Sequence, residues 1–361
     1  MNRRWICSDV WMDILPSFER VELGLKMALL SDRFDVLVDK HFDGKTTELT
    51  IWNTILIRKG IGPKQCVSVR IDGKFVDFPL PERPLPNKIR FKSLYIDYIG
   101  HSVIKFLRSN KQIFDRRGNN LGVNVYYGKT KDVQKIWDVF TSEIWPIFST
   151  NIRQLDFDYD NQLDNLRCHI SPTILTDIDQ LNSIKTYLLI TDEIADDGPN
   201  ATAGQALAKW LHTPSKNGRP KRLFCCNFSY LPKVKWVNNF KKFFTRATAA
   251  VSYKIYFDFR GQPKLLKPFE LVNEQTKEKL TLEKDSHHPC NWVMKRCPII
   301  GEMATVQWEN DENSDTNLNN AFVVPSGRRR RSGSMHRKCR LIVARKPLSP
   351  PAEKKKEKAD E

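Results

Sequence analysis

Strand-like and helix-like stretches alternate through the middle of the chain, from about Phe91 to Phe259. Apolar residues occupy every second position in the strand-like stretches and recur every three or four residues in the helix-like ones. Successive strand-like stretches lie 29 to 36 residues apart, with equivalent positions at Leu94, Val123, Leu155, Tyr187, Leu223 and Tyr253. A repeat of about thirty residues, with one strand and one helix each, is typical of a stacked α/β array.

This repeat predicts an α/β fold, an irregular leucine-rich-repeat-like solenoid with a parallel sheet on its inner face. An open doubly wound sheet would produce a similar alternation, and the order of the strands distinguishes the two folds. The repeat ends near residue 260. The segments PFELVNEQTKEKLTLE and NWVMKRCPI that follow predict three strands, a small C-terminal antiparallel β cap for the open end of the array.

The remaining segments have other compositions. The connection before the repeats contains LTIWNTILIRKG and SVRIDGKFVDFPL, in which Asp72-Gly73 is typical of a hairpin turn. The end of the chain is polar and basic with few apolar residues, which is typical of disorder. We therefore expect five parts: N-terminal helices at 1–42, a β-rich connection at 43–90, the α/β repeats at 91–260, the β cap at 261–308 and a disordered basic tail at 309–361.

The N-terminal segment from Ile6 to Phe42 is rich in apolar residues that recur at helical spacing. Ser8 precedes the first helical stretch as a candidate N-cap, and Asp9 follows in the first turn. Pro16 interrupts the pattern, so we expect two or three short helices. About 40 residues rarely form an independent core, so these helices must pack on the rest of the chain or on another protein.

The same segment resembles an F-box. Ile6-Cys7 stands at the Leu-Pro position of that pattern, Asp9 at the acidic position, Ile14-Leu15 at the Ile-Leu position, and Glu22-Leu23 opens the next helix. Leu30 to Phe34 supplies the ending. The departures are Cys7 in place of proline, Phe34 where tryptophan is common, and one extra residue in the second helix. The segments ELGLKMALLSDRFDVLVDKHF, GQALAKWLHTP and PFELVNEQTKEKLTLE are similar to the expanded F-box family of plant-parasitic nematodes, over roughly residues 5 to 300.

The resemblance implies a non-catalytic substrate receptor of an SCF-type cullin ubiquitin ligase. F-box helices bind a Skp-type adaptor, which links to the cullin scaffold, and the α/β repeats would bind the target protein. An exposed apolar helical surface is also what such an interaction requires. The candidate residues, which either face the adaptor or form the core between the helices, are Ile6, Val10, Ile14, Leu15, Phe18, Leu23, Leu29, Leu30 and Phe34.

Three alternatives remain open at this point. In the first alternative, the N-terminal helices only cover the core of the following domain and bind no adaptor. In the second, the chain is an α/β repeat binding module whose F-box no longer functions, as Cys7 and Phe34 allow. The third alternative, nucleic-acid binding, has only the positive charge in its favour, so nucleic acid is not the expected partner.

The net charge is +17, of which the segment from Ala321 onward contributes +9. A basic tail gives generic affinity for polyanions or serves as an address signal. The run Arg328, Arg329, Arg330 and Arg331 is a possible nuclear import signal. Cytoplasmic or nuclear localisation, or both, is therefore expected.

The sequence contains no recognisable catalytic or metal-binding motif, so we expect no cofactor. Asp156, Asp158 and Asp160 alternate along a strand and predict a solvated sheet face or a partner contact; Asp192, Glu193, Asp196 and Asp197 form a second acidic group. The eight cysteines are scattered, which predicts reduced core thiols. The chain contains no run of 18 apolar residues, so we expect no membrane-spanning helix.

Overall fold

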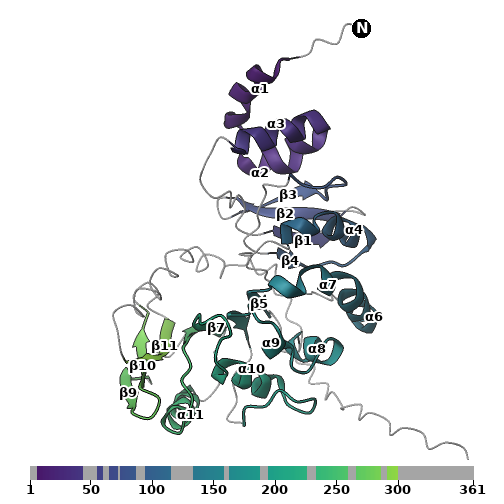
Figure 1. The fold of residues 1–361 in the computed structure, drawn as a ribbon. Coiled ribbons are helices and arrows are strands. Elements are labelled where there is room, and N and C mark those ends of the chain that lie inside the picture. Colours follow the sequence, from purple (N-terminus) through teal and green to yellow (C-terminus); the bar gives the residue numbers. More distant parts are fainter. Residues whose placement is uncertain are drawn as a thin grey trace, which may run out of the picture. The chain divides into compact units, whose positions relative to one another are not determined.

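The computed structural model is a mixed α/β structure (Figure 1). Every described residue belongs to one compact unit, which lies within residues 1–313. The structure describes residues 6–43, 55–59, 65–71, 74–86, 94–114, 133–157, 162–187, 194–225, 233–258, 266–285 and 291–299.

The predicted N-terminal helices are present. They are α1 (Ser8–Ile14), η1 (Leu15–Ser17), α2 (Arg20–Glu22), η2 (Leu23–Met27), η3 (Ala28–Leu30) and α3 (Asp32–Asp43). The prediction that Ser8 caps the first helix is wrong. Cys7 holds the extended N-cap position without a side-chain hydrogen bond, and Ser8 is the first helical residue.

The second helix contains one turn of π-helix, η2, between α2 and the 3₁₀ turn η3. Each backbone hydrogen bond in a π turn spans five residues, so the turn holds one residue more than an α-helical turn. With this additional residue in the turn, Val21 before it and Ala28 after it both remain buried.

Deleting Lys26, an exposed residue of η2, should convert the π turn into an ordinary α-helical turn. The expected loss of unfolding free energy is below about 2 kcal/mol, the combined value of its surface ion pair with Glu22 and its contact with the Phe78 ring. Deleting the equally exposed Val36 from the regular helix α3 is the control, since it rotates Leu37 and Phe42 by about 100° relative to the preceding turn. Urea unfolding that gives equal losses for the two deletions would contradict this account.

A four-stranded sheet follows, with the order β3-β2-β1-β4. Its strands are β1 (Ile55–Lys59), β2 (Gln65–Ile71), β3 (Lys74–Pro79) and β4 (Leu94–Ile96). The predicted hairpin is confirmed, because β2 and β3 are antiparallel with Ile71 opposite Lys74. β4 runs parallel to β1. The strand at Leu94, which the repeat assigns to the α/β array, is thus hydrogen-bonded to the preceding connection.

A seven-stranded sheet has the order β5-β6-β7-β8-β11-β10-β9. Four parallel strands stand in chain order: β5 (Gln154–Asp156), β6 (Ser183–Thr186), β7 (Lys221–Cys225) and β8 (Tyr253–Asp258). The three predicted antiparallel strands are β9 (Phe269–Asn273), β10 (Glu278–Lys284) and β11 (Asn291–Pro298). Because β11 pairs with β8, they extend the same sheet.

Helices connect these strands. They are α4 (His101–Ser109), α5 (Lys111–Phe114), α6 (Val133–Val139), η4 (Phe140–Ile144), α7 (Trp145–Phe148), η5 (Ser149–Asn151), α8 (Gln162–His169), α9 (Ile174–Asp177), α10 (Ala203–His212) and α11 (Lys233–Thr245). Thr202 caps α10 in a capping box with Gln205.

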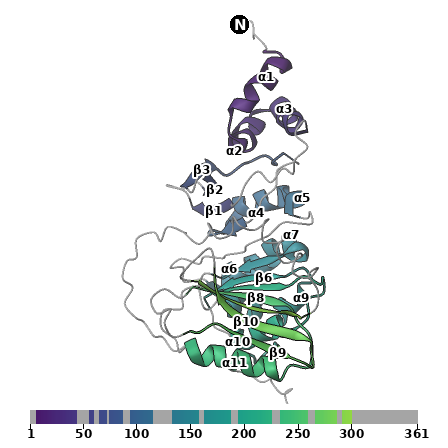
Figure 2. The same ribbon diagram turned by 90° about the vertical axis from the view of Figure 1, so that its left-hand side faces the viewer.

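Helices α10 and α11 cover the same face of β8 (Figure 2). The His212 ring of α10 lies 5.7 Å from the Tyr253 ring, and the Trp236 ring of α11 lies 4.6 Å from that of Phe257. Tyr253 and Phe257 are four residues apart, an even spacing that places them on the same face of the strand, and both are fully buried. They belong to the main hydrophobic core, which extends over both sheets.

Candidate protein-docking surface

The N-terminal helices enclose a small hydrophobic cluster of their own. Its buried members are Leu15, Leu23, Ala28, Leu37, Val38 and Phe42. Trp11 and Phe34 pack at its edge with ring centroids 4.8 Å apart in an edge-to-face arrangement. Of the nine candidate residues, Leu15 and Leu23 are thus core residues between helices, and Phe18 and Phe34 pack partly buried against them.

A second set of side chains attaches these helices to the rest of the chain. Val21 and Leu25 belong to the main core, and Leu29 packs against it. The Lys26 ammonium lies 5.3 Å from the centre of the Phe78 ring on β3. Part of the helical surface therefore covers the neighbouring sheet, as one of the alternatives from the sequence requires.

Four aliphatic side chains of this segment are left facing solvent. Ile6 is 46% exposed, Val10 44%, Leu30 62% and Val36 66%. Helix α1 buries none of its residues, although it contains four apolar ones. The candidate Ile14 is half-buried and belongs to neither cluster. Exposed aliphatic side chains on neighbouring helices are what a protein-docking surface requires.

Val36 is not among the nine candidate residues from the sequence. It lies on the side of α3 opposite Phe34, Leu37 and Val38, so a helical projection at 100° per residue would have placed it alone on the polar face. Such an isolated valine is the signal that could have found it.

Carboxylates lie beside these apolar side chains. Asp32, Asp35 and Asp39 fall on α3, and Asp32 pairs with Arg83 at 2.9 Å. Burial, together with the charges of Asp39 and Asp32, raises the pKa of the Asp35 carboxyl, and Arg83 opposes this shift. Arg33 donates to the backbone oxygen of Ile6 at 2.6 Å, which holds the start of α1 beside α3. The surface thus combines aliphatic side chains with negative charge.

The structure corrects two other predictions. Asp156 is fully buried rather than solvated, and it accepts hydrogen bonds from the Tyr95 hydroxyl at 2.5 Å and from Gln154 at 2.7 Å. Cys7 and Cys168 are exposed, so the expectation of core thiols is wrong for these two; Cys66 and Cys225 are buried.

The second acidic group is described in part. Asp196 accepts from the backbone N–H of Gly198 at 3.0 Å, and Asp197 accepts from the Thr176 hydroxyl at 2.8 Å. The two carboxylates therefore order their own loop and its neighbour. Asp158, Asp160, Asp192, Glu193 and the arginine run 328–331 lie outside the described residues.

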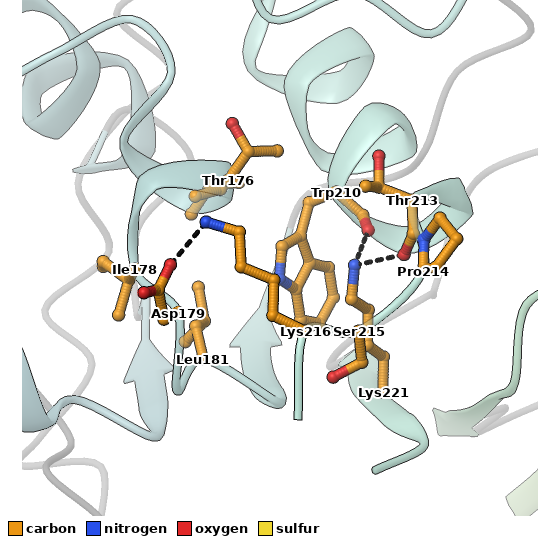
Figure 3. Close-up of a pocket in the computed structure, with 11 residues that line it drawn as sticks. Thr176, Ile178, Asp179, Leu181, Trp210, Thr213, Pro214, Ser215, Lys216 and Lys221 are labelled. Atoms are coloured by element: carbon orange, nitrogen blue, oxygen red, sulfur yellow. Dashed lines mark hydrogen bonds and ion pairs between the residues drawn. The ribbon is translucent and has the colours of Figure 1, made fainter. Parts of the chain in front are cut away.

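A cavity of about 70 Å³ lies between the segment after α9 and the end of α10 (Figure 3). Leu181 and Trp210 line it, an ion pair joins Lys216 to Asp179 at its edge, and Lys221 donates to the carbonyl oxygens of Trp210 and Thr213. Burial lowers the pKa of Lys221 to about 8. Ligand pockets usually measure roughly 300–1,000 Å³, so the cavity is too small for a cofactor. Lys221 instead caps the C-terminus of α10.

Within the described ranges, no group of three or more His, Cys, Asp or Glu residues could hold a metal ion. None of the described helices is long and apolar enough to cross a membrane. In comparisons with known proteins, the chain matches no family model, no curated protein and no solved structure.

Proposed function

We propose that the chain is the substrate-recognition subunit of an SCF-type cullin ubiquitin ligase. Its N-terminal helices bind a Skp-type adaptor, which links it to the cullin scaffold, and its α/β part binds the target protein. The chain itself performs no catalysis in this role. The observation that carries the proposal is the helical segment that packs its own small core and still presents Ile6, Val10, Leu30 and Val36 to solvent.

The way these helices are held supports a docking role. Val21 and Leu25 fix them on the main core, while α1 has no buried residue. A helix that only covered the neighbouring domain would direct its apolar side chains inward. The exposed side chains of α1 and α3 are therefore free to enter an interface, where removing their apolar surface from water is favourable.

The order of the parallel strands supports a diverged leucine-rich-repeat-like array as the target-binding part. β5 to β8 stand side by side in chain order, with helices between successive strands. A doubly wound sheet would reverse its strand order at a switch point. In this proposal β9 to β11 protect the last edge of the array, as stacked repeats require.

The proposal is tested by replacing three exposed candidates together, in the variant Ile6→Glu/Val10→Glu/Leu30→Glu. We expect binding to a purified Skp-type adaptor to weaken at least about tenfold, because three apolar contacts are lost and three charges lose solvent. Isothermal titration calorimetry measures this change. Leu15 is unsuitable for the test because it is fully buried and its replacement would disrupt the helices themselves.

Ile194→Glu is the matched control, since Ile194 is also an exposed aliphatic residue but lies far along the chain, before α10. It should leave adaptor affinity unchanged, and circular dichroism should show equal helix content in both variants. Equal affinities of the wild type and the triple variant would overturn the proposed surface. A wild-type chain that binds no adaptor but retains a target would favour the binding module with a non-functional F-box.

A further inference from the structure

The positive charge outside the tail is concentrated in one stretch. Residues 198–257 contain eleven Lys or Arg and no Asp or Glu. Since the whole chain carries +17 and the tail from Ala321 carries +9, all other residues together carry −3. The stretch spans α10, β7, α11 and β8, which follow one another in the chain. A surface with one sign of charge attracts a partner of the opposite sign.

Three of these cations form an exposed group on two neighbouring helices, here called the basic face: Lys209 on α10, Lys242 on α11 and Arg246 directly after the end of α11. None of the three forms an ion pair with a carboxylate in the described part of the chain. Three lysines of the antiparallel part of the sheet do have such partners. Lys279 pairs with Glu270 and Lys295 with Glu283, while Lys277 pairs with Glu274 in the turn between β9 and β10.

The two helices meet beside these cations. The His212 ring at the end of α10 lies 5.9 Å from the Phe243 ring of α11. Lys209 is three residues before His212 on α10, so the two side chains share a helix face. Arg246 follows α11 and continues its last turn through a bond from its N–H to the oxygen of Lys242, so it lies on the same side of that turn as Phe243. Phe243 is 37% exposed, which places an accessible apolar side chain among the cations.

The helices themselves do not neutralise this charge. The C-terminus of a helix carries roughly half a negative charge, so α10 and α11 together offset about one of the three cations. Lys221 and Asn273 already donate to the terminal carbonyl groups of α10 and α11, respectively. About two positive charges therefore remain for a partner.

We propose that the basic face binds an acidic protein segment, in which Asp or Glu residues flank an apolar side chain that packs on Phe243. Proteins that bind single-stranded nucleic acid stack successive bases on several exposed aromatic rings. On the described part of α11, Phe243 is exposed, while Trp236, Phe240 and Phe244 are buried. Carboxylates around one apolar anchor fit this arrangement better. This inference rests on the proposed function, because it takes the acidic segment to be part of the target protein.

The test uses the full chain and a fluorescein-labelled peptide of Gly and Glu with one central Leu. In fluorescence anisotropy, the variant Lys209→Gln/Lys242→Gln/Arg246→Gln should bind the peptide about fivefold more weakly than the wild type. The control variant Lys277→Gln/Lys279→Gln/Lys295→Gln removes the same net charge from paired positions and should bind normally. The basic tail is present in both variants and contributes equally.

If the two triple variants weaken peptide binding equally, the effect comes from net charge alone and the proposal is wrong. The proposal is also wrong if a labelled oligothymidylate binds more tightly than the peptide and its binding depends on the same three cations. Phe243→Ala should weaken peptide binding without a change of charge, and an unchanged affinity would contradict the apolar anchor. Adaptor binding of the Lys209→Gln/Lys242→Gln/Arg246→Gln variant should equal that of the wild type, so a failure here is distinguishable from a failure of the proposed function.

Discussion

Replacing Arg296 with Met should reduce the unfolding free energy by about 3–5 kcal/mol, because it leaves a buried carboxylate without its partner. Arg296 on β11 donates through Nε and Nη2 to Glu278 Oε2 on β10, at 3.0 and 2.6 Å. Both side chains are at most 2% exposed. Glu278 also accepts from the backbone N–H of Val251, and Arg296 donates to the oxygen of Ala249, both at 2.8 Å. The pair therefore ties two antiparallel strands to the segment after α11.

A double variant separates the charge from the packing. Arg296→Met/Glu278→Leu removes both charges and leaves only the two backbone partners unsatisfied, at about 1–3 kcal/mol. It should therefore be more stable than Arg296→Met alone. The control Lys295→Met breaks an exposed pair on the same strand, with Glu283 at 2.7 Å, and should lose less than about 1 kcal/mol. If urea unfolding shows that Arg296→Met loses no more unfolding free energy than Lys295→Met, the Arg296–Glu278 pair does not stabilise this sheet.

Local patterns in the sequence predicted most elements of the described fold. Strands such as β8 and β10 can be predicted from the alternation of apolar residues, and Asp72-Gly73 predicts the β2–β3 hairpin. Both signals are readable because they depend only on adjacent residues. The pairing of strands depends on distant residues. No local pattern indicates that Leu94 on β4 lies opposite Ile55 on β1.

At the candidate site, too, the sequence revealed local patterns but not contacts between distant residues. Helical spacing identified the apolar residues of the first 42 positions, but it could not tell Leu15, which is fully buried, from Leu30, which is exposed. Alternation likewise grouped Asp156 with neighbouring carboxylates. It could not show that Tyr95, 61 residues earlier, covers the Asp156 side chain. The charge of residues 198–257 can be counted in the sequence, but the net charges of the whole chain and of the tail do not reveal it.

Lowering the pH from 7 to 5 should destabilise the protein by about 2 kcal/mol through His212 alone. Burial, assisted by the charges of Arg296 and Lys221, lowers the pKa of His212 to about 4. Its Nε2 atom is buried without a hydrogen-bond partner, and the rings of Phe240 and Tyr253 lie beside it. The folded protein therefore keeps this imidazole neutral.

The sign of the effect follows from which state takes up the proton. Below about pH 6.5 the unfolded chain protonates His212 and the folded chain does not, so stability falls until the pH reaches about 4. His212→Leu should remove this part of the difference between unfolding free energies at pH 7 and 5, while His101→Leu, which removes an exposed imidazole, should keep it. Equal pH dependence in all three proteins would show that His212 is not held neutral. A neutral His212 also means that the basic face derives its charge from Lys and Arg alone, so its affinity for the acidic peptide should stay constant between pH 6 and 7, where the neighbouring Lys221 is also charged.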